Sequence, residues 1–193
     1  MPPFKGKGLC ACIWDVSNLA WKISYCLNNK HDENLLKTYQ SERSSNVKEY
    51  IETTMRMGEF VNAVGKSPIT NNISADSKGR KSMKSIKPKL GRGLGKPKDK
   101  LRGNIFPQFK NNRKNLDIKF SKKPILVLSN KYKKPLSKKI NFYRNKSNTK
   151  LSRYLENVNC EGLIVRPDRF ILASIKKLKD VEFITKKNLK LLI

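Results

Sequence analysis

The feature that most constrains the fold is a long amphipathic pattern close to the start of the chain. Apolar residues recur there at spacings of three and four, which places them on one face of a helix over residues 9–28. They are Ile13, Val16, Ala20, Ile23 and Leu27. Pro2-Pro3 and the glycines Gly6 and Gly8 precede this pattern, and Asn28-Asn29 ends it. The chain therefore begins with a glycine-flanked turn that leads into a helix, a combination that presents free backbone N–H groups.

Two more helical segments follow. His31-Asp32 offers an N-cap for a short helix over residues 33–43, with Leu35, Leu36 and Tyr39 as its apolar stripe. Ser44-Ser45 is expected to interrupt this helix. A third helix is predicted from about Asn46 to Val64, and Gly65 and Pro68 would stop it.

The second half of the chain reads as a small α/β unit. The apolar run at 123–130 predicts a buried strand, and residues 145–157 predict a helix. Residues 162–174 predict two strands joined by a tight turn at 166–169, and residues 181–185 predict a further strand. The fold class expected is therefore α/β, with a helical part at 1–65, a basic linker rich in Lys, Ser, Gly and Pro at 66–104, and a domain at 105–193.

The net charge of +28 and the pI of about 10.2 are also compatible with a second function. A basic surface neutralises phosphates, so a nucleic-acid-binding protein is the alternative function. The charges over residues 1–60 are nearly balanced, whereas residues 78–123 are strongly basic and resemble a linker. Lysine, asparagine and isoleucine are all plentiful, and an AT-rich genome would produce the same bias without any nucleic-acid partner.

The cysteines and histidine argue against a metal site. Cys10 and Cys12 form C-x-C, no second pair follows, and His31 is the only histidine. We expect reduced thiols in a cytoplasmic protein. Residues 1–20 do not have the pattern of a signal peptide, and no run of eighteen apolar residues predicts a membrane span.

The first stretch, MPPFKGKGLCACIWDVSNLAWKI, closely resembles the C-terminal flavin-binding motif of FAD-dependent aromatic monooxygenases. The nearest subgroups are those similar to (3-hydroxyphenyl)propionate hydroxylase and to phenol or pentachlorophenol monooxygenases. Three further stretches resemble landmarks of that family in the same order: LLKTYQSER at 35–43, GNIFPQ at 103–108 and LIVRPDRFILA at 163–173. Three positions depart from the family pattern, with Lys7 where it usually has Gln, Cys12 where it has Gly and Trp14 where it has Arg.

The resemblance implies a cofactor and a set of residues near it. Main-chain atoms at the start of the helix would line the isoalloxazine ring of FAD, where a helix N-terminus suits developing negative charge. The residues implied are Pro3, Gly6, Lys7, Gly8, Leu9 and Cys10. NAD(P)H would reduce FAD, O2 would be the oxidant and a phenolic ring the substrate. No catalytic acid or base is assigned.

The resemblance also implies that this chain is one portion of a larger enzyme. The dinucleotide-binding part of the family carries G-x-G-x-x-G between a strand and a helix, and no such spacing occurs here. Residues 105–193 would correspond to the family's thioredoxin-like domain, although they contain no C-x-x-C. We therefore expect a fragment that is inactive alone, whose first helices expose an apolar face that packs on the missing FAD domain. A non-catalytic partner of a separate FAD-domain chain is a third possibility.

Several charged residues in these motifs invite a catalytic interpretation. We expect structural roles instead: an ion pair or helix-end contact for Asp15, ion pairs to other elements for Glu42 and Arg43, and a hairpin turn for Arg166 and Asp168. Trp21 is predicted to lie in the core.

Overall fold

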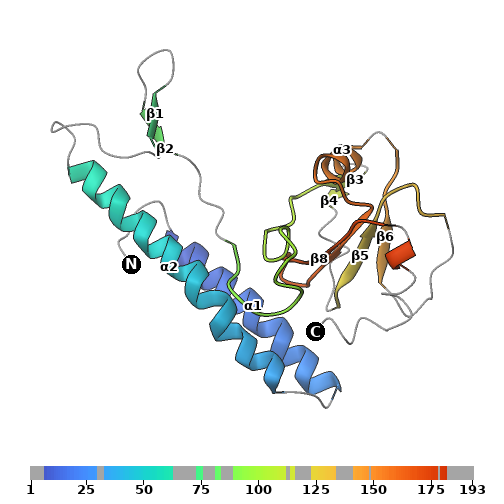
Figure 1. Ribbon diagram of the computed structural model, residues 1–193. Helices are drawn as coiled ribbons and strands as arrows, with labels where there is room; N and C mark the ends of the chain where they lie inside the picture. The colour runs from blue at the N-terminus through green and yellow to red at the C-terminus, as the bar shows by residue number, and fades with distance from the viewer. Residues whose placement is uncertain are drawn as a thin grey trace.

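The structure is a computed structural model of the chain. It describes residues 7–29, 33–62, 73–75, 81–83, 89–111, 114–115, 123–133, 141–147, 149–177 and 179–181. A pair of long helices lies to one side of a small α/β unit (Figure 1). The N-terminal half is helical and the C-terminal half is mixed, as the sequence predicts.

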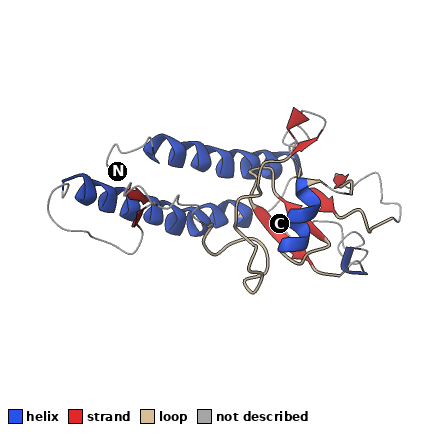
Figure 2. Ribbon diagram, turned by 90° about the horizontal axis from the view of Figure 1, so that it is seen from above, coloured by secondary structure: helices blue, strands red, loops and turns tan. Residues whose placement is uncertain are grey.

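The first helix, α1, spans Lys7–Asn29, and α2 spans Asn34–Asn62. The two helices run side by side in opposite directions (Figures 1 and 2). The prediction for α1 is confirmed with slightly wider bounds. The predicted break at Ser44-Ser45 is wrong, because α2 continues through both exposed serines. Serine is a tolerable helix residue, and the buried side chains on either side of the break, Glu42, Arg43 and Asn46, hold the helix against α1.

The α/β unit is built on a four-stranded mixed sheet in the order β6-β5-β7-β8. Its strands are β5 (Ile125–Leu128), β6 (Phe142–Arg144), β7 (Gly162–Val165) and β8 (Ile171–Ile175). The β5–β6 pair is parallel, and the β5–β7 and β7–β8 pairs are antiparallel. The predicted strand at 123–130 and the predicted hairpin at 162–174 are therefore confirmed, whereas β6 was not predicted.

Helix α3 spans Lys150–Asn157, later than the predicted start at residue 145. Residues 142–144 belong to β6, and Thr149 caps the helix by accepting a hydrogen bond from the Ser152 amide. The strand predicted at 181–185 is not supported at Val181, where residues 179–181 are helical. Residues 182–185 lie outside the described residues.

Four short strands complete the assignment. Ile73–Ala75 (β1) pairs antiparallel with Lys81–Met83 (β2), and Lys110–Asn111 (β3) pairs antiparallel with Lys114–Asn115 (β4). The first pair falls in the stretch read from the sequence as a linker without a period. The proposed domain boundaries at 65 and 104 stay predictions.

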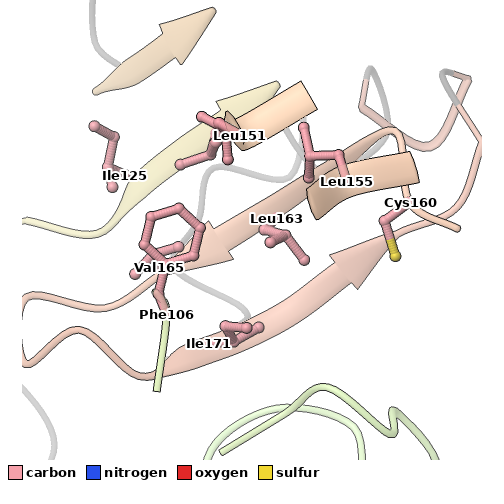
Figure 3. Packing of buried hydrophobic residues seen from close by; sticks show 9 residues of the cluster. Phe106, Ile125, Leu151, Leu155, Cys160, Leu163, Val165 and Ile171 are labelled. Carbon is pink, nitrogen blue, oxygen red and sulfur yellow. The ribbon is translucent and has the colours of Figure 1, made fainter. Parts of the chain in front are cut away.

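Both faces of the sheet are buried. One face packs against α3 and Phe106, and Leu151 and Leu155 of the helix lie in one cluster with Leu163 and Val165 of β7 (Figure 3). The other face is covered by residues that include Leu94, Tyr132 and Val181. Strands covered on both faces are apolar at every position rather than at alternate ones, which explains the continuous run at 125–128.

The segment 89–106 connects the helix pair to the sheet. The Gly91 amide donates to the Glu42 carbonyl of α2 at 2.8 Å, and Leu90 is buried. Further along, the Gly103 amide donates to the Ile171 carbonyl and the Phe106 amide donates to the Arg169 carbonyl, both at 2.8 Å. This part of the predicted linker therefore makes defined contacts with both halves of the molecule.

Candidate functional site

The predicted flavin-facing residues fall at the beginning of α1. Pro3 and Gly6 lie outside the described residues. Lys7, Gly8, Leu9 and Cys10 form the first turn of the helix, where Gly8 is half-buried and the side chains of Leu9 and Cys10 are exposed. The structure thus brings four of the six predicted residues together at one helix end, and the four N–H groups of that first turn have no partner within the helix.

This helix end meets the chemical requirements of an anionic ring system. The first turn of α1 contains no acidic residue that would compete with a negatively charged ligand. The helix dipole places partial positive charge at this end. The residues described here therefore fit the pyrimidine side of a flavin, which gains negative charge on reduction.

The apolar stripe of α1 faces away from α2. Four of its large members are exposed, namely Ile13 (55%), Val16 (66%), Ile23 (41%) and Leu27 (77%), and Leu9 extends the same line. On α2, Ile51 and Met55 are exposed as well. The predicted exposure of an apolar face is confirmed. A contiguous apolar patch of this kind is typical of a surface that another protein segment covers.

The opposite face of α1 carries polar residues into the interior. Asn18 and Lys22 are buried together with Trp21, and all three point toward α2 and the β7–β8 turn. Asp15, Asn18 and Lys22 recur at spacings of three and four, so they share one face. Asn18 matches the family motif in the sequence, but no role was predicted for it. The polar stripe is the signal that could have located Lys22, which the sequence analysis missed.

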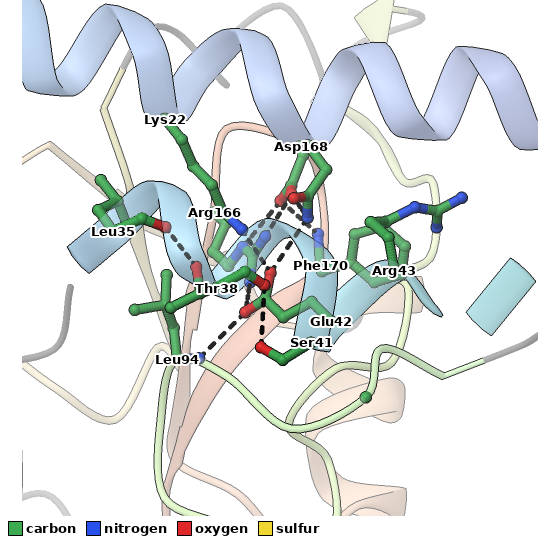
Figure 4. A network of polar contacts seen from close by, with 12 residues as sticks. Lys22, Leu35, Thr38, Ser41, Glu42, Arg43, Leu94, Arg166, Asp168 and Phe170 are labelled. Atoms are coloured by element: carbon green, nitrogen blue, oxygen red, sulfur yellow. Dashed lines mark hydrogen bonds and ion pairs between the residues drawn. The ribbon is translucent and has the colours of Figure 1, made fainter. Parts of the chain in front are cut away.

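Glu42 of α2 is the centre of this buried arrangement (Figure 4). Its carboxylate accepts from Lys22 Nζ at 2.9 Å and from Asn18 Nδ2 at 3.1 Å on one oxygen. The other oxygen accepts from Arg166 Nη1 at 2.7 Å and from the Leu94 amide at 3.0 Å. One carboxylate therefore ties together α1, α2, the 89–106 segment and the β7–β8 turn.

Asp168 forms the second half of the arrangement. It accepts from Arg166 Nε at 3.0 Å and from Nη2 at 2.5 Å, and also from Trp21 Nε1 at 3.0 Å and Asn18 Nδ2 at 3.0 Å. The guanidinium of Arg166 also lies over the Trp21 ring, 5.1 Å from its centroid. We call these six residues the Glu42 cluster: Asn18, Trp21, Lys22, Glu42, Arg166 and Asp168.

The charges within the Glu42 cluster balance, with two cations against two carboxylates. Burial by itself raises the pKa of Glu42, but the charges of Arg166 and Lys22 and their hydrogen bonds outweigh it, and the pKa falls to about 2. Burial lowers the pKa of Lys22, and the nearby Glu42 opposes this only in part. Burial also disfavours the charge on Arg166, but Asp168 and Glu42 together raise its pKa.

The local sequence of the β7–β8 turn explains why Arg166 and Asp168 point inward together. Arg169 has a φ of 68°, and its amide donates to the Arg166 carbonyl at 3.0 Å, which closes the turn. The Asp168 carboxylate caps the Phe170 amide at 3.4 Å. The predicted turn role is therefore confirmed, and the same residues also join the turn to the helix pair.

A second ion pair lies further along the helix pair. Arg43 Nε donates to Asp15 Oδ1 at 2.7 Å, and Arg43 also bonds to the Asn46 side chain and to the Ala11 carbonyl. The structural pairings expected for Asp15 and Arg43 are confirmed. The expected core position of Trp21 is confirmed too, although its indole N–H has a polar partner.

Trp14, one of the departures from the family pattern, packs against the β7–β8 turn. Its ring lies edge-on to Phe170, with centroids 5.3 Å apart.

Within the part of the chain that the structure describes, no group of three or more His, Cys, Asp or Glu residues is arranged to hold a metal ion. None of the helices in the described ranges is long and apolar enough to cross a membrane.

A known protein family matches the part of the chain that contains the helix pair. The sequence profile of the FAD binding domain family matches residues 1–54, which contain α1 and most of α2. Part of the chain is similar in sequence to FAD-dependent aromatic hydroxylases. The resemblance stated from the sequence is thereby confirmed, and FAD is the cofactor that the matches support.

Among curated relatives, a probable NADH-specific resorcinol 4-hydroxylase of Rhodococcus jostii (strain RHA1) is 33% identical over 112 residues. That match covers 56% of this chain and 20% of the relative. A 3-(3-hydroxy-phenyl)propionate/3-hydroxycinnamic acid hydroxylase of Burkholderia vietnamiensis (strain G4 / LMG 22486) is 39% identical over 60 residues, 31% of this chain and 11% of the relative. The 2,4-dichlorophenol 6-monooxygenase of Cupriavidus pinatubonensis (strain JMP 134 / LMG 1197) is 46% identical over 50 residues, 26% of this chain and 8% of the relative.

Solved structures extend the likeness of fold to the whole chain. The flavin-dependent monooxygenase PieE, solved with FAD and substrate, aligns with a TM-score of 0.59 and 13% identity. The alignment covers 99% of this chain and 45% of PieE. The chain is thus similar in fold to part of a flavin monooxygenase and spans less than half of its length.

Proposed function

We propose that this chain supplies the C-terminal portion of a flavoprotein monooxygenase that hydroxylates a phenolic ring with FAD, NAD(P)H and O2. The match of residues 1–54 to the FAD binding domain carries this proposal. The relatives named above act on aromatic substrates by their names, and the chain spans only a small share of their length. The nucleic-acid alternative receives no support from these matches.

The first turn of α1 is the proposed flavin contact. Pro3, Gly6 and the residues from Lys7 to Cys10 would face the pyrimidine side of the isoalloxazine, mainly through backbone atoms. FAD, when bound, supplies electron transfer from the nicotinamide and the activation of O2. The contribution of this chain is a helix end that stabilises negative charge, without an acidic side chain in its first turn.

The exposed stripe of α1 is the proposed contact with the rest of the FAD domain. Ile13, Val16, Ile23 and Leu27 lie on one side of the helix, while the Glu42 cluster holds the opposite side against the chain's own α/β unit. A helix held on one side and apolar on the other can dock without rearranging its own core. The isolated chain is then inactive, because it contains only part of the proposed flavin site.

We further propose that residues 105–193 form the thioredoxin-like domain of such an enzyme. A mixed four-stranded sheet packed against α3 supports this proposal. The described cysteines are all free, which suits a cytoplasmic protein, the setting we propose. The single thiol of this domain, Cys160, is buried and has no second cysteine in the domain sequence, so we assign it no redox function.

The proposal requires a preceding segment that supplies the rest of the FAD domain, and the test uses the chain extended by that segment. The extended protein should consume O2 when NADH or NADPH is added, and a phenol such as resorcinol should accelerate the consumption and yield a hydroxylated product. The 193-residue chain, assayed alone with added FAD, is the control and should be inactive. An extended protein that folds but consumes no O2 with either nicotinamide contradicts the proposed function.

A further inference from the structure

A lysine-lined cavity lies on the α/β unit, in a part of the molecule that the proposed flavin contact does not use. Its volume is about 740 Å³, within the range of small-molecule sites. Six lysines contribute to its lining: Lys96, Lys98, Lys100, Lys176, Lys177 and Lys179. They come from two chain segments about eighty residues apart, one before the sheet and one following β8.

Asp99 holds the two segments together. One of its carboxylate oxygens accepts from the Leu101 amide at 2.9 Å, and the other accepts from the Ser174 amide of β8. The loop that contains Asp99 therefore lies against β8 (Figure 1). Gly95, with a φ of 86°, turns the chain so closely onto the Leu172 carbonyl that a side chain would collide with it. The lysines are thus gathered by a defined backbone arrangement.

The charge around the cavity is unbalanced. Among the described residues of the lining there are two carboxylates, Asp99 and Asp180, against six lysines, and both oxygens of Asp99 already bond to backbone amides. The lysines are all exposed, so their ammonium groups are free to approach a ligand. Cys160 adds no negative charge, because burial raises the pKa of its thiol. An anion bound here would relieve repulsion among like charges.

The remaining lining residues indicate the kind of anion. Leu101 and Val158 give the cavity an apolar wall, and none of the described residues that line it is aromatic. Nucleic-acid grooves that bind single strands use aromatic side chains on which bases stack, so a discrete small molecule fits this cavity better than a polymer. We propose that this cavity binds a small molecule carrying two or more phosphate groups, with lysines of both segments contacting the phosphates.

The test is equilibrium binding of inorganic tripolyphosphate and, in a separate arm, ATP, which carries the same number of phosphates, to the full 193-residue chain. Both should bind, with the affinity falling as salt is raised. A matching affinity for the two probes assigns the site to the phosphates alone, whereas tighter binding of ATP shows that the apolar wall contributes as well. Substituting three cavity lysines by glutamine should weaken binding at least tenfold: Lys96→Gln, Lys98→Gln and Lys100→Gln.

A matched triple variant removes the same charge from exposed positions elsewhere and should change the affinity less than twofold. Its substitutions are Lys37→Gln, Lys133→Gln and Lys150→Gln. Equal weakening by both triples would show that binding follows net charge and would overturn the proposal. No binding of either probe by the wild-type chain would overturn it too, as would preferential binding of an oligonucleotide that both triples weaken alike.

A second measurement avoids variants altogether. Amine-reactive acylation of the wild-type chain, read by mass spectrometry, should be slowed by ATP at residues 96–100 and 176–179 and not at Lys37 or Lys150. Uniform protection of all lysines, or none, contradicts the assignment.

Discussion

Arg166 of the β7–β8 turn donates a 2.7 Å hydrogen bond to Glu42 of α2, a residue 124 positions earlier in the chain. Both side chains are almost completely buried. Since an unpaired buried charge is costly, each residue depends on the other. The helix pair that begins at the proposed flavin contact is thereby fixed to the C-terminal half of the chain.

Replacing Glu42 by glutamine should lower the free energy of unfolding by about 3 kcal/mol, because Arg166 and Lys22 then lose their shared negative charge. Urea unfolding followed by circular dichroism measures this. Glu49→Gln, an exposed position on the same helix, is the matched control and should change stability by less than about 0.5 kcal/mol. Equal effects of the two substitutions would show that the Glu42 pairing contributes nothing.

Lowering the pH should reduce the free energy of unfolding through protonation of Glu42. The pKa of Glu42 is about 2 in the folded state against 4.5 as its ordinary value. The lowered value stabilises the fold above pH 4.5, and this contribution of roughly 3 kcal/mol is lost as the pH falls toward 2. Unfolding free energies measured from pH 6 to pH 2 on the wild type and on Glu42→Gln should diverge least at the acid end. A constant difference across that range would contradict the assignment.

Gly91 should not tolerate a side chain. A Cβ there would collide with the Ser41 carbonyl and the Ser45 hydroxyl of α2, where the segment 89–106 meets the helix. We expect Gly91→Ala to lower the melting temperature, while Gly58→Ala, inside α2, should raise stability by about 0.5 to 1 kcal/mol through helix propensity. An unchanged melting temperature for Gly91→Ala would mean that the segment does not pack as described.

The exposed stripe of α1 should make the isolated chain associate. Replacing Ile13, Val16 and Leu27 by glutamine should reduce light scattering and shift the chain toward the monomer in gel filtration. Their exposure predicts little change in unfolding free energy. Lys37→Gln, on the neighbouring helix, is the control and should leave association unchanged. A wild-type chain that is already monomeric at high concentration would argue against a docking surface.

The sequence predicted elements well where the signal is local. The 3.6-residue period defined α1, and the apolar runs defined β5 and the β7–β8 hairpin. The predicted helix break at Ser44-Ser45 was wrong, because the burial of Glu42 and Asn46 on either side outweighs the weak local preference of two serines. The sequence did not predict β6, a strand of three residues at the edge of the sheet, because so short a segment has no readable period.

The sequence predicted only part of the candidate site, because its signals are local. Ion pairs were expected for Asp15, Glu42 and Arg43, but their partners were not, because the Glu42 partners lie 20 and 124 residues away. Arg166 and Asp168 were expected in a turn, and the turn alone does not reveal that two helices cover it. Only the fold brings these distant residues together.

We propose that the start of α1 forms part of an FAD site, and flavin content tests this proposal most directly. The chain extended by the segment that supplies the rest of the proposed FAD domain should purify as a yellow protein with one FAD per polypeptide. Gly8→Val, at the proposed contact, should weaken FAD binding at least tenfold, whereas Gly58→Ala in α2 should leave it unchanged. An extended protein that folds but retains no flavin once free FAD is removed, or one in which both variants bind FAD equally well, would contradict this proposal.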